Sequence, residues 1–496
     1  MVSVGKGGTF AVNQRRAPLF EALKHHVTRN YTGFHFPGHG GGAGLPRVFP
    51  AGRELFRFDL TELPGLDDLH APAGPIARAQ ELAAALYGAD RTFFLVNGST
   101  AGVQALLLAA TAPGEKVLLP RNAHRAVIGG LVLSGADPVY VTPPFDAEWG
   151  FFRPPRPADV RAALQAHPDL RAVLLTHPDY YGQAVVDAEM AEVLRETGAI
   201  FLADEAHGAH LPFHAAMPVP ALRLGAAAAA QSLHKLGGAL TQASLLHLKG
   251  TGLSPARVSR ALALLQTSSP SYLLMASLDL ARRQLAVSGG RRFGRAVDLA
   301  GRLRLGLAAL DGVEVFDAGP GRADPTKVMV STRGLGLSGH RAAAVLRDKH
   351  SVQVEAAGFG HLLFVVGLGT RAPDIARTLG AFRALAREHA PSDLRRQTSG
   401  RRPPASDFHL WPAPPAPKVL TPRESWFAPA RAVPVREASG LVAAETVSLC
   451  PPGIPIVFPG ERLTPEVLEY TLEIRAGGVA FQAADPGLKT IMVHDG

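Results

Sequence analysis

Cysteine is almost absent from this chain of 496 residues, which has only Cys450. One cysteine cannot form an internal disulfide framework or a cysteine-based zinc site, and such sequences are typical of the cytosol. Long apolar runs are also missing: no stretch approaches the roughly 18 consecutive apolar residues of a membrane span. Residues 1–20 lack the apolar core of a signal peptide. We therefore expect a cytoplasmic protein that is neither secreted nor embedded in a membrane.

Lysine is scarce, although the chain is basic. Lysine and arginine together number 51 against 42 acidic residues, which gives a net charge of +9. Nine of the basic residues are lysine, and 51 − 9 leaves 42 arginines. The densest basic clusters, 291–295 and 395–402, contain one aromatic residue, Phe293, and no nucleic-acid-binding motif. We expect no nucleic-acid partner, and a lysine inside an apolar, glycine-flanked segment is notable.

Short apolar runs alternate with segments of helical periodicity over much of the chain. With 47% hydrophobic residues, the protein can bury large cores. The expected strands are 92–96, 116–119, 138–141, 172–176, 200–204, 227–232 and 243–248, and the expected helices between them are 99–112, 123–134, 158–166 and 188–197. Such alternation predicts an α/β fold with a mostly parallel sheet that binds ligands at the carboxyl ends of its strands.

The same patterns predict five regions. An N-terminal segment, 1–50, has a helix at 17–27, and a major domain, 51–310, ends with helices at 255–265 and 272–310. A small α+β domain, 311–390, is expected to have strands 313–316, 327–331, 352–355 and 362–366 and helices 338–349 and 374–389. Residues 391–419 are rich in proline and arginine, which is typical of a linker. Residues 420–496 are expected to form a C-terminal α+β domain.

A turn of small residues, Asn97-Gly98-Ser99-Thr100, follows the first expected strand and opens a helix. Exposed backbone N–H groups and the helix dipole favour an anion at such a turn, and the hydroxyls of Ser99 and Thr100 can donate to phosphate oxygens. Serine and threonine also serve there as ordinary helix caps, so the turn alone is a weak signal.

Two charged residues follow later strands. Asp204 ends a buried strand, where its charge is costly unless a cation such as a protonated pyridine nitrogen meets it. Lys235 lies in the segment 231–238, whose apolar and glycine residues would desolvate the amine, lower its pKa and favour a Schiff base. Taken alone, a lysine in such a segment more often lies on an exposed turn than in a cofactor site. The order of phosphate turn, aspartate and lysine, each after a strand, favours a covalent cofactor site.

Histidines near these segments allow two interpretations. His124 begins a helix after a strand, so its ring could stack on a flat cofactor, although a lone histidine there is more often a cap. His207, His210 and His214 are close enough in sequence to suggest a metal. Pro212 would break the helix that aligns them, and no carboxylate or thiol follows at ligand spacing. We expect no metal site.

Several motifs in this order resemble one family of enzymes. They are 36–39 (Phe-Pro-Gly-His), 61–69, 97–100, 204–208, 234–235, 267–272 and 451–455 (Pro-Pro-Gly-Ile-Pro). The set is similar to fold-type I pyridoxal-phosphate enzymes of the ornithine/lysine/arginine decarboxylase family, in the shorter form without an N-terminal wing domain. Segments 61–69 and 451–455 are the most specific, because other fold-type I enzymes do not share them.

The resemblance implies a role for each candidate residue. Lys235 would bind pyridoxal 5'-phosphate covalently, Asp204 would pair with its pyridine nitrogen, and His124 would stack on its ring. The residues implied in phosphate binding are Ser99, Thr100 and Ser232, and His234 would contact the phosphate or the lysine linkage. Lys235 or a neighbouring histidine, for which His207 is our candidate, would return a proton to the substrate.

The implied reaction is decarboxylation of a basic L-amino acid. Arginine, giving agmatine for polyamine synthesis, is favoured because the shorter form of the family is associated with it; lysine and ornithine stay open. Glu445, shortly before the Pro-Pro-Gly segment, is our candidate for an acidic wall that binds the cationic side chain. Family members are dimers or dimer-based oligomers with shared active sites, so we expect at least a dimer, either a homodimer or a dimer-based oligomer.

Three departures from the family pattern leave the choice of amino acid open. Leu233 and Asp179 stand where threonine is common, and Cys450 stands where tyrosine usually precedes Pro-Pro-Gly.

Two other functions also stay open: another fold-type I reaction, such as that of an aminotransferase or an aldolase-like enzyme, and a non-catalytic regulator with the same fold. Intact Lys235 and Asp204 argue against the regulator.

Overall fold

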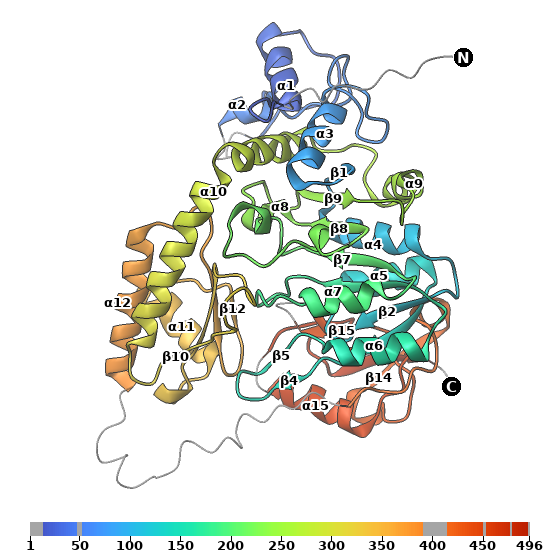
Figure 1. Ribbon diagram of the computed structural model, residues 1–496, viewed down its shortest axis with the longest axis vertical. Coiled ribbons are helices and arrows are strands. Elements are labelled where there is room, and N and C mark those ends of the chain that lie inside the picture. Colours follow the sequence, from blue (N-terminus) through green and yellow to red (C-terminus); the bar gives the residue numbers. More distant parts are fainter. Residues whose placement is uncertain (1–12, 47–51, 390–413, 450–452, 477–478, 495–496) are drawn as a thin grey trace.

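The computed structural model describes residues 13–46, 52–389, 414–449, 453–476 and 479–494. Figure 1 shows a central sheet covered by helices, a smaller α/β body at one side of it, and a third body formed by the C-terminal residues below it. The long helix α10 (Tyr272–Ala308) runs from the central part into the smaller body. No helix in the described part of the chain is both long enough and apolar enough to cross a membrane.

The central sheet has seven strands in the order β1-β9-β8-β7-β6-β2-β3. Its strands are β1 (Arg91–Leu95), β2 (Lys116–Pro120), β3 (Asp137–Val141), β6 (Leu170–Thr176), β7 (Ile200–Asp204), β8 (Ala228–Gln231) and β9 (Ser244–Leu248). Only β9 runs against the others, because it pairs antiparallel with both β8 and β1. The mostly parallel sheet predicted from the sequence is therefore confirmed, and most of its strands are buried along nearly their whole length, as expected for a sheet covered on both faces.

The helices of this part lie between the strands and flank them. They are α1 (Pro18–Arg29), α2 (Arg53–Phe56), α3 (Pro75–Tyr87), α4 (Gly98–Ala110), α5 (Arg125–Ser134), α6 (Pro157–Ala166), α7 (Ala188–Arg195), α8 (Leu233–Leu236) and α9 (Pro255–Leu265). Local sequence fixes several starts: Asp187 caps α7, and Ser254 caps α9 with proline in its first turn. Helix α4 packs so closely on the sheet that a Cβ at Gly102 would come within 2.8 Å of Leu95.

The smaller body contains a four-stranded antiparallel sheet in the order β10-β11-β13-β12. Its elements are β10 (Glu314–Val315), β11 (Lys327–Ser331), β12 (Ala356–Ala357), β13 (Leu362–Val365), α11 (Gly339–His350) and α12 (Ala372–His389). The predicted strand at 352–355 is wrong: Val352 and Val354 are buried, but the paired residues come later, at Ala356 and Ala357. Alternating burial there reflects packing into a core beside α11 without strand pairing.

The C-terminal body has its own apolar core. It contains α14 (Pro422–Phe427), α15 (Pro465–Ala476) and the strands β14 (Ala430–Pro434), β15 (Val447–Leu449), β16 (Ile454–Val457), β17 (Phe481–Gln482) and β18 (Thr490–His494). Strands β16, β15 and β17 form one antiparallel sheet, and β14 pairs with β18. A short hairpin, β4 (Phe145–Asp146) and β5 (Phe151–Phe152), completes the strands. Residues 391–413, most of the predicted linker, lie outside the described residues. The five region boundaries stay predictions.

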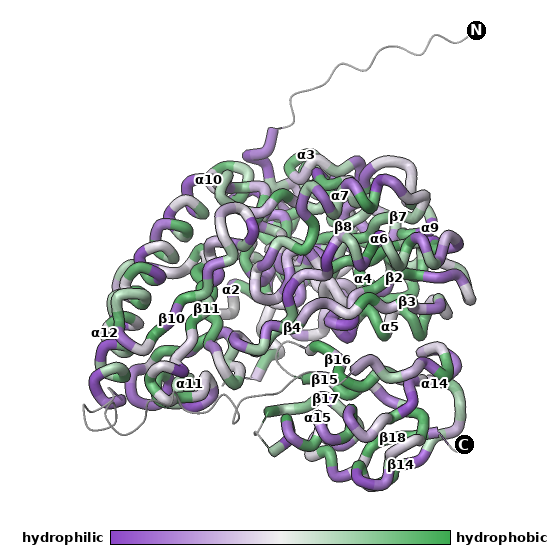
Figure 2. The backbone as a smooth tube through the Cα atoms, turned by 60° about the horizontal axis from the view of Figure 1, so that its bottom comes forward, coloured by the Kyte–Doolittle hydropathy of each residue, from purple (hydrophilic) through white to green (hydrophobic). Residues whose placement is uncertain are grey.

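A buried ion pair joins the C-terminal body to the central one. Arg121 directly follows β2, and its two terminal guanidinium nitrogens, Nη1 and Nη2, donate to the two carboxylate oxygens of Glu461 at 2.6 and 2.9 Å. The guanidinium also lies 4.4 Å from the ring centre of Phe458. Side-chain exposure is 13% for Arg121 and 4% for Glu461. Figure 2 shows β15, β16 and β17 on the side of this body that faces the rest of the molecule.

Removing one partner of this pair leaves a buried charge without its counterion. We expect Glu461→Ala to lower the free energy of unfolding by about 3 kcal/mol. Chemical denaturation measures the loss. The matched control is Glu388→Ala, which breaks the exposed ion pair with Lys349 and should leave the midpoint unchanged. Equal midpoints for both variants would contradict a role for the pair in docking the two bodies.

Candidate active site

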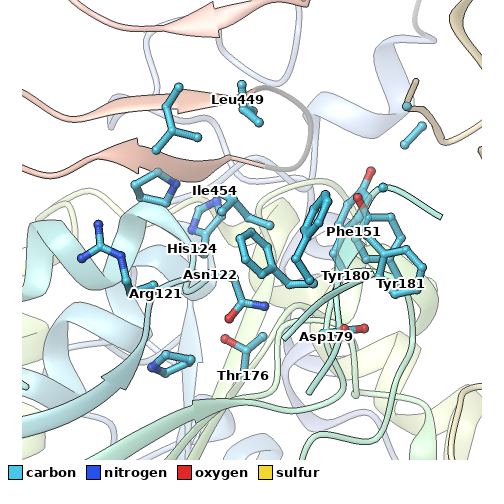
Figure 3. A pocket seen from close by; sticks show the side chains of 18 of the residues that line it. Arg121, Asn122, His124, Phe151, Thr176, Asp179, Tyr180, Tyr181, Leu449 and Ile454 are labelled. Carbon is cyan, nitrogen blue, oxygen red and sulfur yellow. The ribbon is translucent and has the colours of Figure 1, made fainter. Parts of the chain in front are cut away.

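One cavity of about 330 Å³ lies where the carboxyl ends of the parallel strands meet the other two bodies. The central body supplies Ser99, His124, Asp204 and Lys235, among others. Segment 356–361 of the smaller body contributes to another wall, and Leu449 and Ile454 of the C-terminal body to a third. In Figure 3, Leu449 and Ile454 lie on strands above Asn122 and His124, while Tyr180, Tyr181 and Phe151 gather at the other side.

Lys235 lies in α8, directly after β8, and its amine reaches the cavity. Its Nζ atom is hydrogen-bonded to Nε2 of His207 at 2.8 Å. Desolvation lowers the pKa of Lys235, and the negative charge of Asp204 opposes that shift only in part. The side chain is also accessible from the cavity mouth. A reachable amine with a lowered pKa suits covalent bonding to a carbonyl compound.

Asp204 is the last residue of β7 and is 3% exposed. One carboxylate oxygen accepts a hydrogen bond from the backbone N–H of Ala206 at 3.2 Å, and the side chain lines the cavity. Its neighbour Glu205 points elsewhere, because its two oxygens accept from Ala221 N and Gln231 Nε2. Burial raises the pKa of Glu205 to about 7. Successive side chains along extended backbone point to opposite sides, so Asp204 faces the cavity and Glu205 faces the core.

The predicted phosphate turn is brought next to the lysine segment. Ser99, in the first turn of α4, lines the cavity, and its hydroxyl accepts a hydrogen bond from Ser232 Oγ at 2.7 Å. Ser232 is itself buried at the end of β8. Thr100 is exposed and does not line the cavity within this chain. Backbone N–H groups at the start of α4 and two hydroxyls can therefore receive an anion here.

His124 caps α5, and its Nδ1 accepts from the backbone N–H of Ala126 at 3.1 Å. Burial lowers its pKa, so the ring is neutral near pH 7. The C-terminal body touches this ring: Gly453 has φ of +89°, and a Cβ at that position would lie 3.0 Å from His124 Nε2. A side chain at residue 453 would push the ring, which explains the glycine. Cys450 and the two prolines before Gly453 lie outside the described residues.

Two other predicted histidines have different surroundings. His207 lines the cavity beside Lys235, and desolvation together with the charges of Lys327 and Lys235 lowers its pKa well below the usual value. His234 does not line the cavity; its Nδ1 is hydrogen-bonded to the carbonyl of Ala243 at 3.2 Å. His207 is thus placed for proton exchange with Lys235, and the contact of His234 with the phosphate or the lysine linkage stays a prediction.

The smaller body holds two cavity loops through a buried segment that the sequence did not single out. Asp324 accepts from Nε2 of His210 at 2.9 Å, and its backbone N–H donates to the carbonyl of Gly182 at 2.8 Å. Lys327 is 5% exposed and donates to the carbonyls of Tyr180 at 2.5 Å and Asp179 at 3.3 Å. Desolvation lowers the pKa of Lys327 to about 8. The scarcity of lysine was the one signal that could have drawn attention to Lys327.

Glu445 does not line this cavity within the single chain, and its proposed role in binding the substrate cation stays a prediction. Its two carboxylate oxygens accept from the backbone N–H groups of Ala484 at 2.6 Å and Met492 at 2.8 Å. Both oxygens are used to fix turns of the C-terminal body, which leaves them poorly placed to bind a substrate cation.

The departures from the family pattern differ in consequence. Asp179 lines the cavity, but its carboxylate accepts two hydrogen bonds from Gln183, at 2.6 and 2.8 Å. Burial raises the pKa of Asp179 to about 6. Leu233 is fully buried in the core and faces no ligand. Of the two described positions, only residue 179 borders the cavity.

These residues fit pyridoxal phosphate, the cofactor implied by the resemblance. The cavity offers an amine for the aldehyde, a buried carboxylate for the ring nitrogen, and hydroxyls with a helix start for the phosphate. It also offers the flat ring of His124.

Comparison with known families identifies both large parts of the chain. Residues 17–320 match the family model described as Orn/Lys/Arg decarboxylase, major domain, and residues 410–492 match its C-terminal domain. The chain is 36% identical to arginine decarboxylase of Bacillus subtilis over 482 residues, which cover 96% of each protein. It is also 36% identical to arginine decarboxylase of Halalkalibacterium halodurans, covering 97% of this chain and 98% of that protein.

Solved structures show the same fold. Lysine decarboxylase LdcF of Francisella novicida has a TM-score of 0.81 and 20% identity, covering 97% of this chain and 81% of that one. The Escherichia coli constitutive lysine decarboxylase gives 0.81 and 20%, covering 98% and 82%. An alanine–glyoxylate aminotransferase from Nostoc reaches 0.53 and covers 66% of this chain. The decarboxylase structures therefore match a much larger share of the chain than this aminotransferase does.

The buried ammonium of Lys327 should help to keep His207 neutral. Replacing it in Lys327→Met removes a charge that lowers the pKa of His207, so that pKa rises. Because His207 then protonates at higher pH, we expect the acid limb of the kcat/KM profile to move upward by about one pH unit.

Two controls separate this effect from a loss of structure. Lys327→Arg keeps the charge and should keep the position of the acid limb, and Lys349→Met removes an exposed lysine on α11. An acid limb that stays in place in Lys327→Met would show that Lys327 does not control this titration.

Proposed function

The chain belongs to the Orn/Lys/Arg decarboxylase family, and from this premise we propose that it converts L-arginine to agmatine and CO₂. It is an amino-acid decarboxylase with pyridoxal phosphate as its cofactor, which confirms the resemblance found in the sequence. The observation that carries arginine as substrate is the near full-length match to two arginine decarboxylases. Lysine and ornithine are the competing substrates.

When bound, pyridoxal phosphate supplies an electron sink for the charge left on the substrate carbon as CO₂ departs. The protein would hold the group through four sets of residues. Lys235 would bind it covalently, Asp204 would keep a proton on its ring nitrogen, and His124 would lie against its ring. Ser99, Ser232 and the start of α4 would bind its phosphate, in line with their shared hydrogen bond at 2.7 Å.

The pair formed by Lys235 and His207 would handle the proton that replaces CO₂. The hydrogen bond at 2.8 Å allows a proton to pass between Nζ and Nε2. Burial makes the charged form of either group costly, so each one readily gives its proton away. The strands of the C-terminal body that close the cavity would exclude water and protect the reacting carbon.

The wider role is proposed on chemical grounds. Agmatine is a precursor of polyamines, so a cytosolic enzyme of polyamine synthesis is consistent with a chain that has one cysteine. We also propose a homodimer with shared active sites. The exposed aromatic rings of Tyr31, Phe34 and Phe36, 64%, 98% and 80% accessible, support a protein contact at the loop after α1.

A parallel assay tests the reaction and its substrate. Purified enzyme with pyridoxal phosphate is given arginine, lysine, ornithine and leucine, and CO₂ and amine are measured. We expect agmatine from arginine and no amine from leucine. Lys235→Ala should lower kcat by about 10⁴-fold or more, because the covalent bond and a proton carrier are lost. Comparable turnover in that variant, or a keto acid in place of CO₂, would contradict the proposal.

Sedimentation velocity tests the assembly. We expect twice the chain mass of 52.2 kDa, or a multiple of it, for the active enzyme. Phe34→Ser combined with Phe36→Ser should shift the protein toward the monomer and lower activity in parallel, since apolar contact area is lost. A fully active monomer would rule out shared active sites.

A further inference from the structure

A substrate with a cationic side chain needs an acidic partner in the cavity, because an unpaired charge is costly there. Among the described residues that line the cavity, the carboxylates are Asp179 and Asp204. Asp179 is occupied by two hydrogen bonds from Gln183. Asp204 is needed by the ring nitrogen of the cofactor. Since Glu445 lies elsewhere, the acidic partner within this chain must come from a residue next to the lining.

Glu355 has that position. It precedes Ala356 and Ala357, which line the cavity from the smaller body. Its Oε1 accepts a hydrogen bond of 3.0 Å from the hydroxyl of Tyr180, a residue of the cavity wall. The ring of Tyr180 in turn meets the ring of His207 edge-on, with 5.3 Å between the ring centres. Glu355 is thus one aromatic side chain away from the group bonded to Lys235.

The electrostatics agree with this geometry. The negative charge of Glu355 raises the pKa of both Lys235 and Lys327, in opposition to the larger effect of desolvation. Glu355 therefore acts on the amine of Lys235, which lines the cavity, and on the amine of Lys327. Within the described part of the chain, no arginine or lysine forms an ion pair with it, and its side chain is exposed next to Ala356 of the cavity lining.

One hydrogen bond, from a tyrosine that is itself held in place, orients the side chain of Glu355. Tyr180 donates to one carboxylate oxygen, and Tyr180 is itself held by the bond from Lys327 Nζ to its carbonyl at 2.5 Å. Each carboxylate oxygen can accept more than one hydrogen bond. A carboxylate held by Tyr180 through one oxygen can therefore still accept two parallel N–H bonds from a guanidinium. The ring of Tyr180, which bonds to Glu355 and packs on the ring of Tyr181, favours a flat cation over a compact ammonium.

We propose that Glu355 is the specificity-determining carboxylate that accepts the guanidinium of arginine, with Tyr180 as its positioning residue. The inference rests on the proposed arginine decarboxylation and deepens it by naming the group that selects a cationic side chain. It replaces Glu445 in that role and assigns the recognition of the substrate to the smaller body.

The test compares the holoenzyme with Glu355→Gln, Glu355→Asp and the control Glu192→Gln, an exposed glutamate on α7. Arginine and citrulline, its uncharged isostere, serve as substrates, and calorimetry measures the Kd of agmatine. We expect Glu355→Gln to raise the arginine KM and the agmatine Kd by about tenfold or more, with kcat within about threefold. The preference for arginine over citrulline should fall by a similar factor, and Glu355→Asp should lie between.

The other outcomes overturn the assignment in recognisable ways. Unchanged KM and Kd in Glu355→Gln would show that the guanidinium binds elsewhere. A fall in kcat without a change in the agmatine Kd would give Glu355 a structural or catalytic role in place of recognition. If wild-type enzyme releases no CO₂ from arginine, the proposed function fails; if it does and Glu355→Gln behaves like the control, this inference alone fails.

Discussion

The structure depends on one constraint: a charged group in the cavity that Lys235 lines loses its hydration, which costs free energy unless an opposite charge meets it. Lys235 places an amine among apolar walls, and desolvation there outweighs the attraction of Asp204, so the pKa of the amine falls. The same cost keeps His207 and His124 neutral. A neutral amine attacks a carbonyl, a neutral imidazole accepts a proton, and a carboxylate at the end of β7 is stable only with a cation before it. The arrangement is therefore suited to a group with an aldehyde and a protonated ring.

Buried polar contacts from distant parts of the chain keep this cavity in shape. Asp324 and Lys327 tie the smaller body to the loops that carry Tyr180 and His207. On the opposite side, Arg121 and Glu461 hold the C-terminal body against the end of β2. Each contact would be expensive to break, because each leaves a buried group without its partner. The cavity walls are thus fixed relative to the lysine by tertiary contacts between all three bodies.

Recognition and reaction use different parts of the cavity. The groups implied in cofactor binding come from the carboxyl ends of the central strands, where parallel sheets commonly bind ligands. The proposed partner of the substrate side chain, Glu355, comes from the smaller body, and the apolar closure comes from β15 and β16. Substrate choice can therefore change through the outer bodies while the lysine, the aspartate and the phosphate turn stay constant.

The sequence by itself determined the alternation of strands and helices, because apolar periodicity and capping residues act over a few neighbouring positions. It also singled out Lys235, Asp204 and Ser99, which the structure places in the lining of one cavity, since each lies at or just after the end of a strand that faces the binding edge. The strand expected at 352–355 failed because burial of Val352 and Val354 gives the same pattern without pairing. Glu445 shows a related limit of local patterns: sequence distance from a motif does not fix where a carboxylate points, and in this chain its oxygens accept from Ala484 and Met492.

Only the tertiary structure decided which residues from separate segments meet. His207 reaches Lys235, Gly453 touches His124, and Lys327 reaches the carbonyl of Tyr180 across long stretches of chain. Such contacts are set by how sheets and helices pack, and no local pattern encodes a partner that lies elsewhere in the sequence. The sequence showed which chemical groups are present. Their pKa values and the choice of substrate depend on burial and on neighbouring groups, which only the folded chain provides.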